Sequence, residues 1–247
     1  MEVHTHSHTP RKKWTHYFWE FLMLFLAVFC GFLAENQREH FVEHQREKQY
    51  MQSMVEDLVL DTAELSFIMN HIDSNLLPVL SVSKELLFHL QFSDSMVKKM
   101  YEYVPRSSRF LALNIEDRTM NQLKSSGNLR LIRNKAVTDS LAAYWKVVDL
   151  LNNTLIRSYD LARIEVKNIS YSLFNFDYYT GNNPILPLIK DARPKLVSED
   201  KKEFIKLANF ISNLHSQAAF SIRSKIKDAK EKATNLIQLI KEKYHFQ

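Results

Sequence analysis

The segment LAAYWKVVDLLNNTLIRSYDLARIEVKNISYSLF, residues 141–174, decides the fold class of this chain. Its apolar and aromatic residues recur at alternating steps of four and three, which places them along one face of an α-helix. The members of this seam are Leu141, Trp145, Val148, Asn152, Leu155, Tyr159, Ala162, Val166, Ile169 and Leu173. Asn152 is its polar member, and a buried polar residue in such a seam can fix the register between helices. The pattern predicts a long helix near residues 134–174.

Two more long helices are predicted on either side of this segment. The first lies near residues 35–74 and carries a second seam with alternating steps, formed by Met51, Val55, Leu58, Thr62, Leu65, Met69, Ile72 and Leu76. We expect Asn75 and Pro78 to interrupt it, because proline lacks a backbone N–H. The other lies near residues 198–245, with a mean step of about 3.6 residues, and Ser198 is its predicted N-cap. Three such helices predict an all-α protein, an antiparallel helical bundle.

The regions between the long helices are less regular. Short helices are predicted at residues 86–90, 96–103 and 119–124. Pro105 is expected to end the second of these, and Gly127 to cap the third in the left-handed conformation. Residues 175–197 contain Gly181 and three prolines, which indicates a long connection.

An unbroken apolar run, FLMLFLAVFCGFLA, occupies residues 21–34, and residues 17–34 contain one charge, Glu20. As a helix those 18 residues rise about 27 Å, close to the ~30 Å hydrocarbon core of a bilayer. Basic residues at 11–13 and aromatic residues at 14–19 precede the run, as is typical of a membrane anchor. A cleaved signal peptide fits less well, because bulky phenylalanines stand where the cleavage site requires small residues.

The predicted organisation is therefore a disordered leader at 1–16, a transmembrane helix at 17–34 that continues into the next segment, and a helical bundle domain at 35–247. Three basic residues flank the span on each side: Arg11, Lys12 and Lys13 before it, and Arg38, Arg46 and Lys48 after it. Those before it are packed together beside the span. We therefore expect the N-terminus to lie inside the cell and the bundle outside the cytoplasm.

Composition excludes several classes of protein. The chain has 3 glycines, too few for the phosphate-binding loops of nucleotide-binding α/β folds. A single cysteine, Cys30, excludes an internal disulfide framework and a Cys-rich zinc site. The net charge of +5 is modest for a nucleic-acid-binding protein of this size, so no nucleic-acid partner is predicted.

Two groups of histidines are the weak candidates for metal binding. His4, His6 and His8 form an H-x-H-x-H run in the leader, and imidazoles in such a run can bind Zn²⁺, Ni²⁺ or Cu²⁺. His40 and His44 belong to the sequence HFVEH, which matches the inverted zinc-protease motif. The leader has no apolar residues to order it, and the His40/His44 pair lacks an evident third ligand, so solvated histidines are favoured in both places. We predict no catalytic residues, no metal and no cofactor.

Two further clusters have a bland and a functional interpretation. Basic residues on the last helix, between Arg223 and Lys232, are interrupted by Asp228 and Glu231, which favours a solvated helix face over a nucleic-acid or lipid patch. Aromatic residues surround the start of the 175–197 connection, namely Tyr171, Phe174, Phe176, Tyr178 and Tyr179. They can cap the core or line a ligand pocket at one end of the bundle, and the core is favoured.

The block HTHSHTPRKKWTHYFWEFLMLFLAVFCGFLAENQREHFVEHQREKQYMQSMVEDLVLD and the later stretch MNQLKSSGNLRLIRNKAVTDSLAAYW carry a resemblance. Together they cover about a third of the chain. They resemble a family of uncharacterised bacterial single-span membrane proteins, which share a His-rich leader, the span, an A-E-N-x-R-E-H exit and a helical L-x-x-D-L-x-x-D stretch. The resemblance implies a bacterial membrane protein of unassigned role with a helical soluble domain, and it supplies no catalytic residues to carry over.

These observations support one function and one alternative. The first is a membrane-anchored helical scaffold of the bacterial cell envelope, without catalytic activity, that contacts the lipid bilayer and a protein partner or a second copy through its helical seams. The alternative is an extracytoplasmic ligand-sensing bundle that works with a separate signalling partner, because a helix continuous with the span can transmit a small shift.

Overall fold

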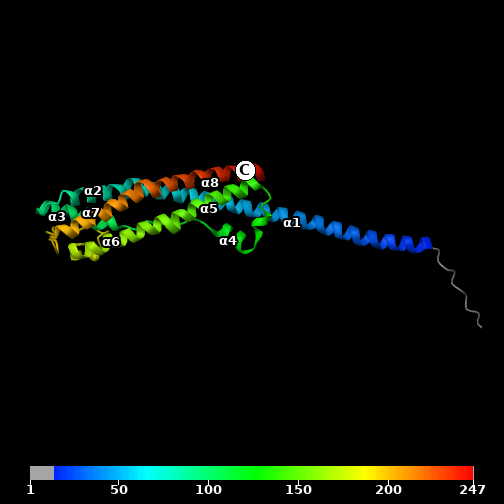
Figure 1. The fold of residues 1–247 in the computed structure, drawn as a ribbon, viewed down its shortest axis with the longest axis horizontal. Helices are drawn as coiled ribbons and strands as arrows, with labels where there is room; N and C mark the ends of the chain where they lie inside the picture. The colour runs from blue at the N-terminus through cyan, green and yellow to red at the C-terminus, as the bar shows by residue number, and fades with distance from the viewer. Residues whose placement is uncertain (1–13, 247) are drawn as a thin grey trace, which may run out of the picture. The chain divides into compact units, whose positions relative to one another are not determined.

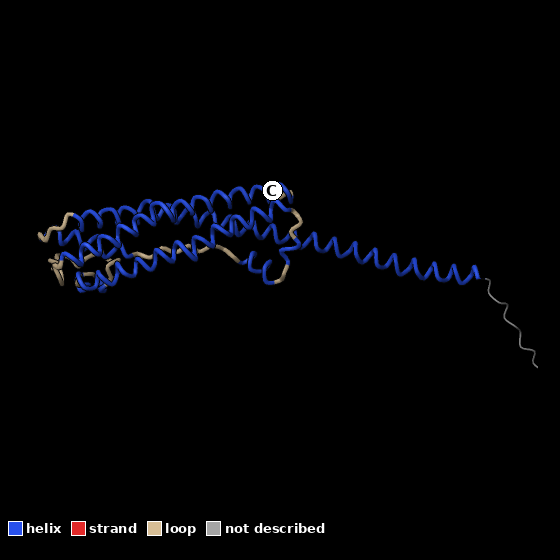
Figure 2. The backbone as a smooth tube through the Cα atoms, viewed as in Figure 1, coloured by secondary structure: helices blue, strands red, loops and turns tan. Residues whose placement is uncertain are grey.

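The computed structural model describes residues 14–246 and confirms the all-α prediction. Figure 2 shows helix along most of this part of the chain. Its β structure is limited to two isolated bridges, Phe174 with Leu196 and Tyr179 with Leu188. The chain divides into two units between Tyr50 and Met51, so residues 35–50, expected to belong to the bundle domain, group with the N-terminal unit.

The N-terminal unit consists of the first part of helix α1 (Trp14–His71). Its large apolar side chains between Trp14 and Leu33 are exposed, and its most apolar 18-residue window has a mean hydropathy of 2.0. In the described part of the chain this is the one helix long and apolar enough to cross a membrane.

The compact unit is built from three long helical rods (Figure 1). Rod 1 is the end of α1, a π-helical turn at Ile72–Leu76 and α2 (Leu77–Phe88). Rod 2 is α5 (Lys135–Leu150), a π turn at Leu151–Ile156 and α6 (Arg157–Leu173). Rod 3 is α7 (Lys201–Ser216), a π turn at Gln217–Ile222 and α8 (Arg223–Tyr244).

Rod 3 runs antiparallel to the other two rods. Helix α7 packs against both α2 and α6, and α8 packs against α5. Rods 1 and 2 run in the same direction, because residues 89–134 carry the chain back along the bundle between them (Figure 1). That return contains α3 (Asp94–Tyr103), α4 (Arg118–Ser125) and an extended stretch between Arg109 and Asp117.

The prediction that Asn75 and Pro78 end the first helix is wrong. A π turn at Ile72–Leu76 joins α1 directly to α2, and Pro78 occupies the first turn of α2. Pro78 supplies no N–H to this continuous helix, and it directly follows a π turn, where the regular α-helical hydrogen bonding is already interrupted. The short helix predicted at 86–90 is therefore the last part of α2, not a separate element.

The apolar face of α1 is also rotated from the predicted seam. Met51, Leu58, Leu65 and Ile72 are buried as predicted, but the positions between them on the buried face are Met54, Asp61 and Ile68. The predicted members Val55, Thr62 and Met69 are half-buried. This rotation takes Asp61 into the protein interior, and Asp57 lies beside it one turn earlier.

The remaining local predictions are partly confirmed. Gly127 has φ +68° and follows α4 in the left-handed conformation, as predicted. The N-cap of α7 is Asp200, whose carboxylate accepts the Lys202 N–H at 2.9 Å, so the assignment of this cap to Ser198 is wrong. Asn152 lies half-buried within a π turn, and the fully buried residue there is Leu151.

Candidate functional site

Two carboxylates occupy the interior of the compact unit. Asp57 and Asp61 lie one helical turn apart on α1, and each is 1% exposed. Burial of charged groups is costly unless they are paired or hydrogen-bonded, so their partners indicate their role.

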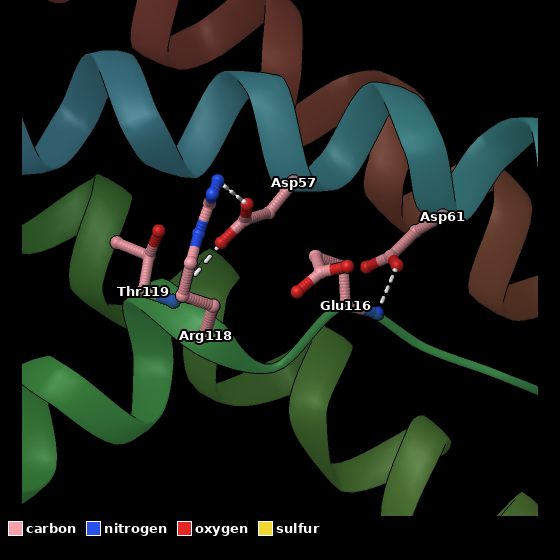
Figure 3. Close-up of polar contacts among 5 residues, drawn as sticks. All are labelled: Asp57, Asp61, Glu116, Arg118 and Thr119. Atoms are coloured by element: carbon pink, nitrogen blue, oxygen red, sulfur yellow. Dashed lines mark hydrogen bonds and ion pairs between the residues drawn. The ribbon is translucent and has the colours of Figure 1, made fainter.

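Every oxygen of these two carboxylates has a hydrogen-bond donor. Figure 3 shows the donors from Glu116, Arg118 and Thr119. Asp57 accepts the Thr119 N–H at 3.0 Å and an Arg118 guanidinium N–H at 2.6 Å. Asp61 accepts the Glu116 N–H at 2.7 Å and the Tyr144 hydroxyl at 2.6 Å. We call these groups the carboxylate network.

Asp61 differs from Asp57 in having no cation among these donors. Burial raises the pKa of the Asp61 carboxyl to about 6, and the nearby acidic groups of Asp57 and Glu116 add to this. The bonds from Tyr144 and from the Glu116 N–H oppose the shift, because they favour the charged carboxylate. Burial and the Asp61 charge raise the pKa of the Tyr144 phenol, so it stays protonated and can keep donating.

The carboxylate network holds the extended stretch before α4 against α1. Glu64, one turn beyond Asp61, also accepts the Asn114 N–H at 3.2 Å. Three acidic side chains of α1 thus accept N–H groups that have no partner in a sheet or helix. A buried backbone N–H needs an acceptor, and these side chains supply it. The geometry gives these aspartates an architectural role.

A cavity of about 410 Å³ lies at the other end of the same stretch. We call it the basic cavity. It is lined by Pro105, Ser108, Arg109, Phe110, Arg163, Lys167, Ser170, Tyr171, Phe176, Asn182, Asn183, Pro184 and Ile185. Three of these described residues are cationic, none is acidic, and several are aromatic or aliphatic.

The three cations of the basic cavity differ in their surroundings. Arg163 is paired with Asp160 at 2.7 Å and donates to the Ser108 carbonyl at 3.3 Å. Lys167 lies 5.7 Å from the centre of the Tyr171 ring. The Arg109 Nε is buried without a hydrogen-bond partner in the described chain, and burial together with Arg106 lowers the pKa of Arg109.

The aromatic cluster around residue 175 serves both of its predicted roles. Phe174 and Tyr179 are buried against Tyr101, and the Tyr179 hydroxyl donates to the Tyr101 carbonyl. Tyr171 and Phe176 instead form an edge-to-face pair on the wall of the basic cavity, with ring centres 5.0 Å apart. The cluster therefore caps the core on one side and lines a cavity on the other.

The structure does not assemble a metal site from the histidines that it describes. His40 and His44 are more than half exposed, and each faces a glutamate three residues later, at 4.0 Å and 3.4 Å. In the described part of the chain, no group of three His, Cys, Asp or Glu residues is placed to hold a metal ion. The other candidates, His4, His6 and His8, lie outside the described residues.

The basic residues of α8 are largely engaged with nearby acids. Arg223 donates to Asp73 at 2.7 Å and 3.1 Å, which ties α8 to the π turn of rod 1. Lys225 and Lys232 both pair with Asp228. These contacts support the interpretation of this surface as a solvated, ion-paired helix face.

No family model, no curated protein and no solved structure matches the chain. The candidate site therefore depends on geometry alone. Sequence reasoning named Tyr171 and Phe176 as a candidate pocket wall but missed the cations of the basic cavity, because the lining comes from three separate segments at 105–110, 163–171 and 176–185. The carboxylate network had a visible signal, since Asp61 lies seven residues from both Met54 and Ile68 and so shares their helix face.

Proposed function

We propose that this chain is a single-span membrane protein of the bacterial inner membrane, and that its helical bundle is an interaction module without catalytic activity. Its N-terminus lies inside the cell and the bundle lies outside the cytoplasm. The observation that carries the proposal is the change of surface along one helix. Helix α1 exposes apolar side chains around its circumference from Trp14 to Leu33, whereas from Met51 onward it buries one face within the compact unit.

An exposed apolar surface of this size is unfavourable in water and matches the hydrocarbon core of a bilayer. The aromatic residues at its start, Trp14, Tyr17 and Trp19, are 82%, 56% and 60% exposed, as expected of side chains at a membrane interface. The same helix then supplies the first rod of the bundle, so one continuous α-helix belongs to both the anchor and the domain.

Topology reporters test this proposal. Alkaline phosphatase and a fluorescent protein are fused in turn after Gln247, and the expected result is phosphatase activity without fluorescence. In a matched pair of variants, Phe25→Lys with Val28→Lys should release the chain from the membrane fraction. Val59→Lys with Leu60→Lys changes two exposed apolar residues of the compact unit and should leave the chain there. Fluorescence without phosphatase activity would reverse the orientation, and a soluble wild-type chain would overturn the anchor.

The predicted seams are not the surfaces with which this module would bind a protein partner. The seam residues Met51, Leu58 and Leu65 are at most 1% exposed within the single chain, so the chain fills these seams itself. We propose that a protein partner or a second copy contacts the outer faces of the bundle. Light scattering of the purified chain in mild detergent, with a stable monomer and no co-purified protein, would count against this.

The sensing alternative is favoured by a specific observation, the basic cavity. A protein that only held partners together would not need a cavity lined by cations and aromatic rings. A second cavity of about 420 Å³ shares Arg109, Phe110 and Ile185 with it and reaches Glu64, Phe67 and His71 of α1. A ligand in the basic cavity would therefore lie against residues that line a second cavity together with the helix leading to the span.

A further inference from the structure

We propose that the basic cavity binds a small organic anion, with a carboxylate or phosphate group held by Arg109 and Lys167 and an aromatic or aliphatic body against Tyr171 and Phe176. This ligand class is the one that the sensing alternative would use. Only the biological use of the ligand rests on that alternative, whereas binding itself does not. Every residue involved lies within the compact unit, so ligand binding can be tested separately from membrane topology.

The first argument is the balance of charge around the basic cavity. Asp160 neutralises Arg163, which leaves Arg109 and Lys167 without a carboxylate among the residues that line the cavity. Burial near Arg106 disfavours the charge of Arg109 and lowers its pKa. An anion in the cavity would relieve both the desolvation and the repulsion between the two guanidinium groups.

The second argument is the hydrogen bonding of the arginines. Arg106 donates to the Pro184 and Leu186 carbonyls at 3.2 Å and 3.4 Å, and Arg163 donates to Asp160 and Ser108. These contacts anchor both side chains to the protein. The buried Nε of Arg109 has no such acceptor, although a buried polar atom normally has one. Arg109 thus lines the cavity without the Nε hydrogen bonds that fix the other two side chains, and a planar guanidinium is suited to binding a carboxylate or phosphate.

The third argument concerns the remainder of the ligand. About 410 Å³ lies within the usual range of small-molecule sites and exceeds what an inorganic ion needs. Tyr171 and Phe176 offer ring surface, and Pro184 and Ile185 add further apolar surface to the lining. An anion with an attached ring or short chain fills this volume better than phosphate alone.

Calorimetric titration of the full chain in a neutral detergent tests the inference with four probes. The probes are phenyl phosphate, phenylacetate, the uncharged 2-phenylethanol and inorganic phosphate. We expect both aromatic anions to bind, and 2-phenylethanol and inorganic phosphate to bind at least about tenfold more weakly, because each lacks one of the two recognised parts. Equal binding of 2-phenylethanol or of inorganic phosphate would overturn the assigned ligand class.

Variants then locate the binding site. Arg109→Met should weaken binding of phenyl phosphate by at least about tenfold, because it removes a charge-assisted contact. Lys167→Met should also weaken binding of phenyl phosphate. It should disturb the fold little, since this side chain is exposed. The matched control is Lys98→Met, an exposed lysine on α3 outside the cavity, which should bind like the wild type.

Circular dichroism checks that each variant is folded before its titration is compared. Absence of binding by both aromatic anions up to millimolar concentration overturns the inference. Unchanged binding in both Arg109→Met and Lys167→Met also overturns it, because the ligand would then occupy another place. Neither result would affect the topology experiment, which reports only on the anchor.

Discussion

The carboxylate network and the basic cavity lie at the two ends of one stretch of chain, residues 109–119. They differ in whether their buried charged groups have hydrogen-bond partners within the chain. At the network end, Asp57 and Asp61 are almost fully buried, and each of their oxygens accepts a hydrogen bond. At the cavity end, Arg109 is a partly buried cation whose Nε has no acceptor.

The difference separates architecture from binding. A buried charge whose hydrogen bonds are complete within the chain specifies how segments pack, and removing it leaves partners unsatisfied. Burial and the neighbouring Arg106 disfavour the charge of Arg109, and an anion bound in the cavity would offset this cost. Urea unfolding of the full chain in mild detergent can compare the stability of variants at or next to either end of this stretch.

Asp57→Ala should give the largest effect, a loss of about 3 kcal/mol in the free energy of unfolding. The change removes the acceptor of the buried Thr119 N–H and detaches the start of α4 from α1. The control is Glu56→Ala, which removes the same charge from the adjacent exposed position and should change stability little. Equal effects of the two variants would show that Asp57 acts only through its charge.

The pH dependence of stability should show a second, smaller effect, of about 2 kcal/mol between pH 7.5 and pH 4.5. The pKa of Asp61 is about 6 in the folded chain and about 3.9 in an unfolded one, so the folded state holds a proton that the unfolded state has lost between these values. Stability from this group is therefore present below pH 4 and is lost as the pH rises through 6.

Asp61→Asn isolates this contribution, because an amide cannot titrate. The difference in the free energy of unfolding between the wild type and Asp61→Asn should shift in favour of the wild type as the pH falls from 7.5 to 4.5. A difference that stayed constant over this range would mean that the Tyr144 and Glu116 hydrogen bonds fully offset the effect of burial.

Two arginines three residues apart should change stability by about 1 kcal/mol in opposite directions. Arg109→Met should stabilise the free protein, because it removes a desolvated cation with an unpartnered Nε. Arg106→Met should destabilise it, because this side chain donates to two loop carbonyls. If Arg109→Met destabilised the chain as well, the contrast between the two ends of the stretch would fail.

Arg118→Gln should have the smallest effect of the series. Arg118 is largely exposed, so water can replace its contact with Asp57, and the Thr119 bond to Asp57 remains. The small difference from the wild type should shrink further in 1 M NaCl, because salt screens exposed ion pairs. A loss as large as that of Asp57→Ala would mean that the ion pair, not the backbone bond, holds α4.

The sequence was sufficient for the helical class, the three rods and the left-handed Gly127, because each depends on local periodicity or on one backbone conformation. It was insufficient for the face of α1 that is buried. Thr62 and Asp61 are both polar, and although Asp61 shares a helix face with Met54 and Ile68, its partners Glu116 and Tyr144 lie far along the chain, where local periodicity does not reveal them. The basic cavity was also beyond local patterns, although Tyr171 and Phe176 were recognised as a candidate pocket wall.

The three π turns have a consequence for how the rods keep their alignment. The turns of rods 2 and 3 contact each other, and Asp73 in the turn of rod 1 binds Arg223 next to the turn of rod 3, so all three lie at one level. A π turn holds one residue more than an α turn, so the helix beyond it is out of phase by about 100° with the helix before it.

Every rod has this change of helical phase at the same level. The bundle is therefore equivalent to two shorter bundles joined end to end at the π turns. Loss of one residue from a single turn, such as Asn153 in rod 2, would turn half of one rod away from an axis that the other two still share. Insertions and deletions at this level are thus compatible with the fold only when the three rods change together.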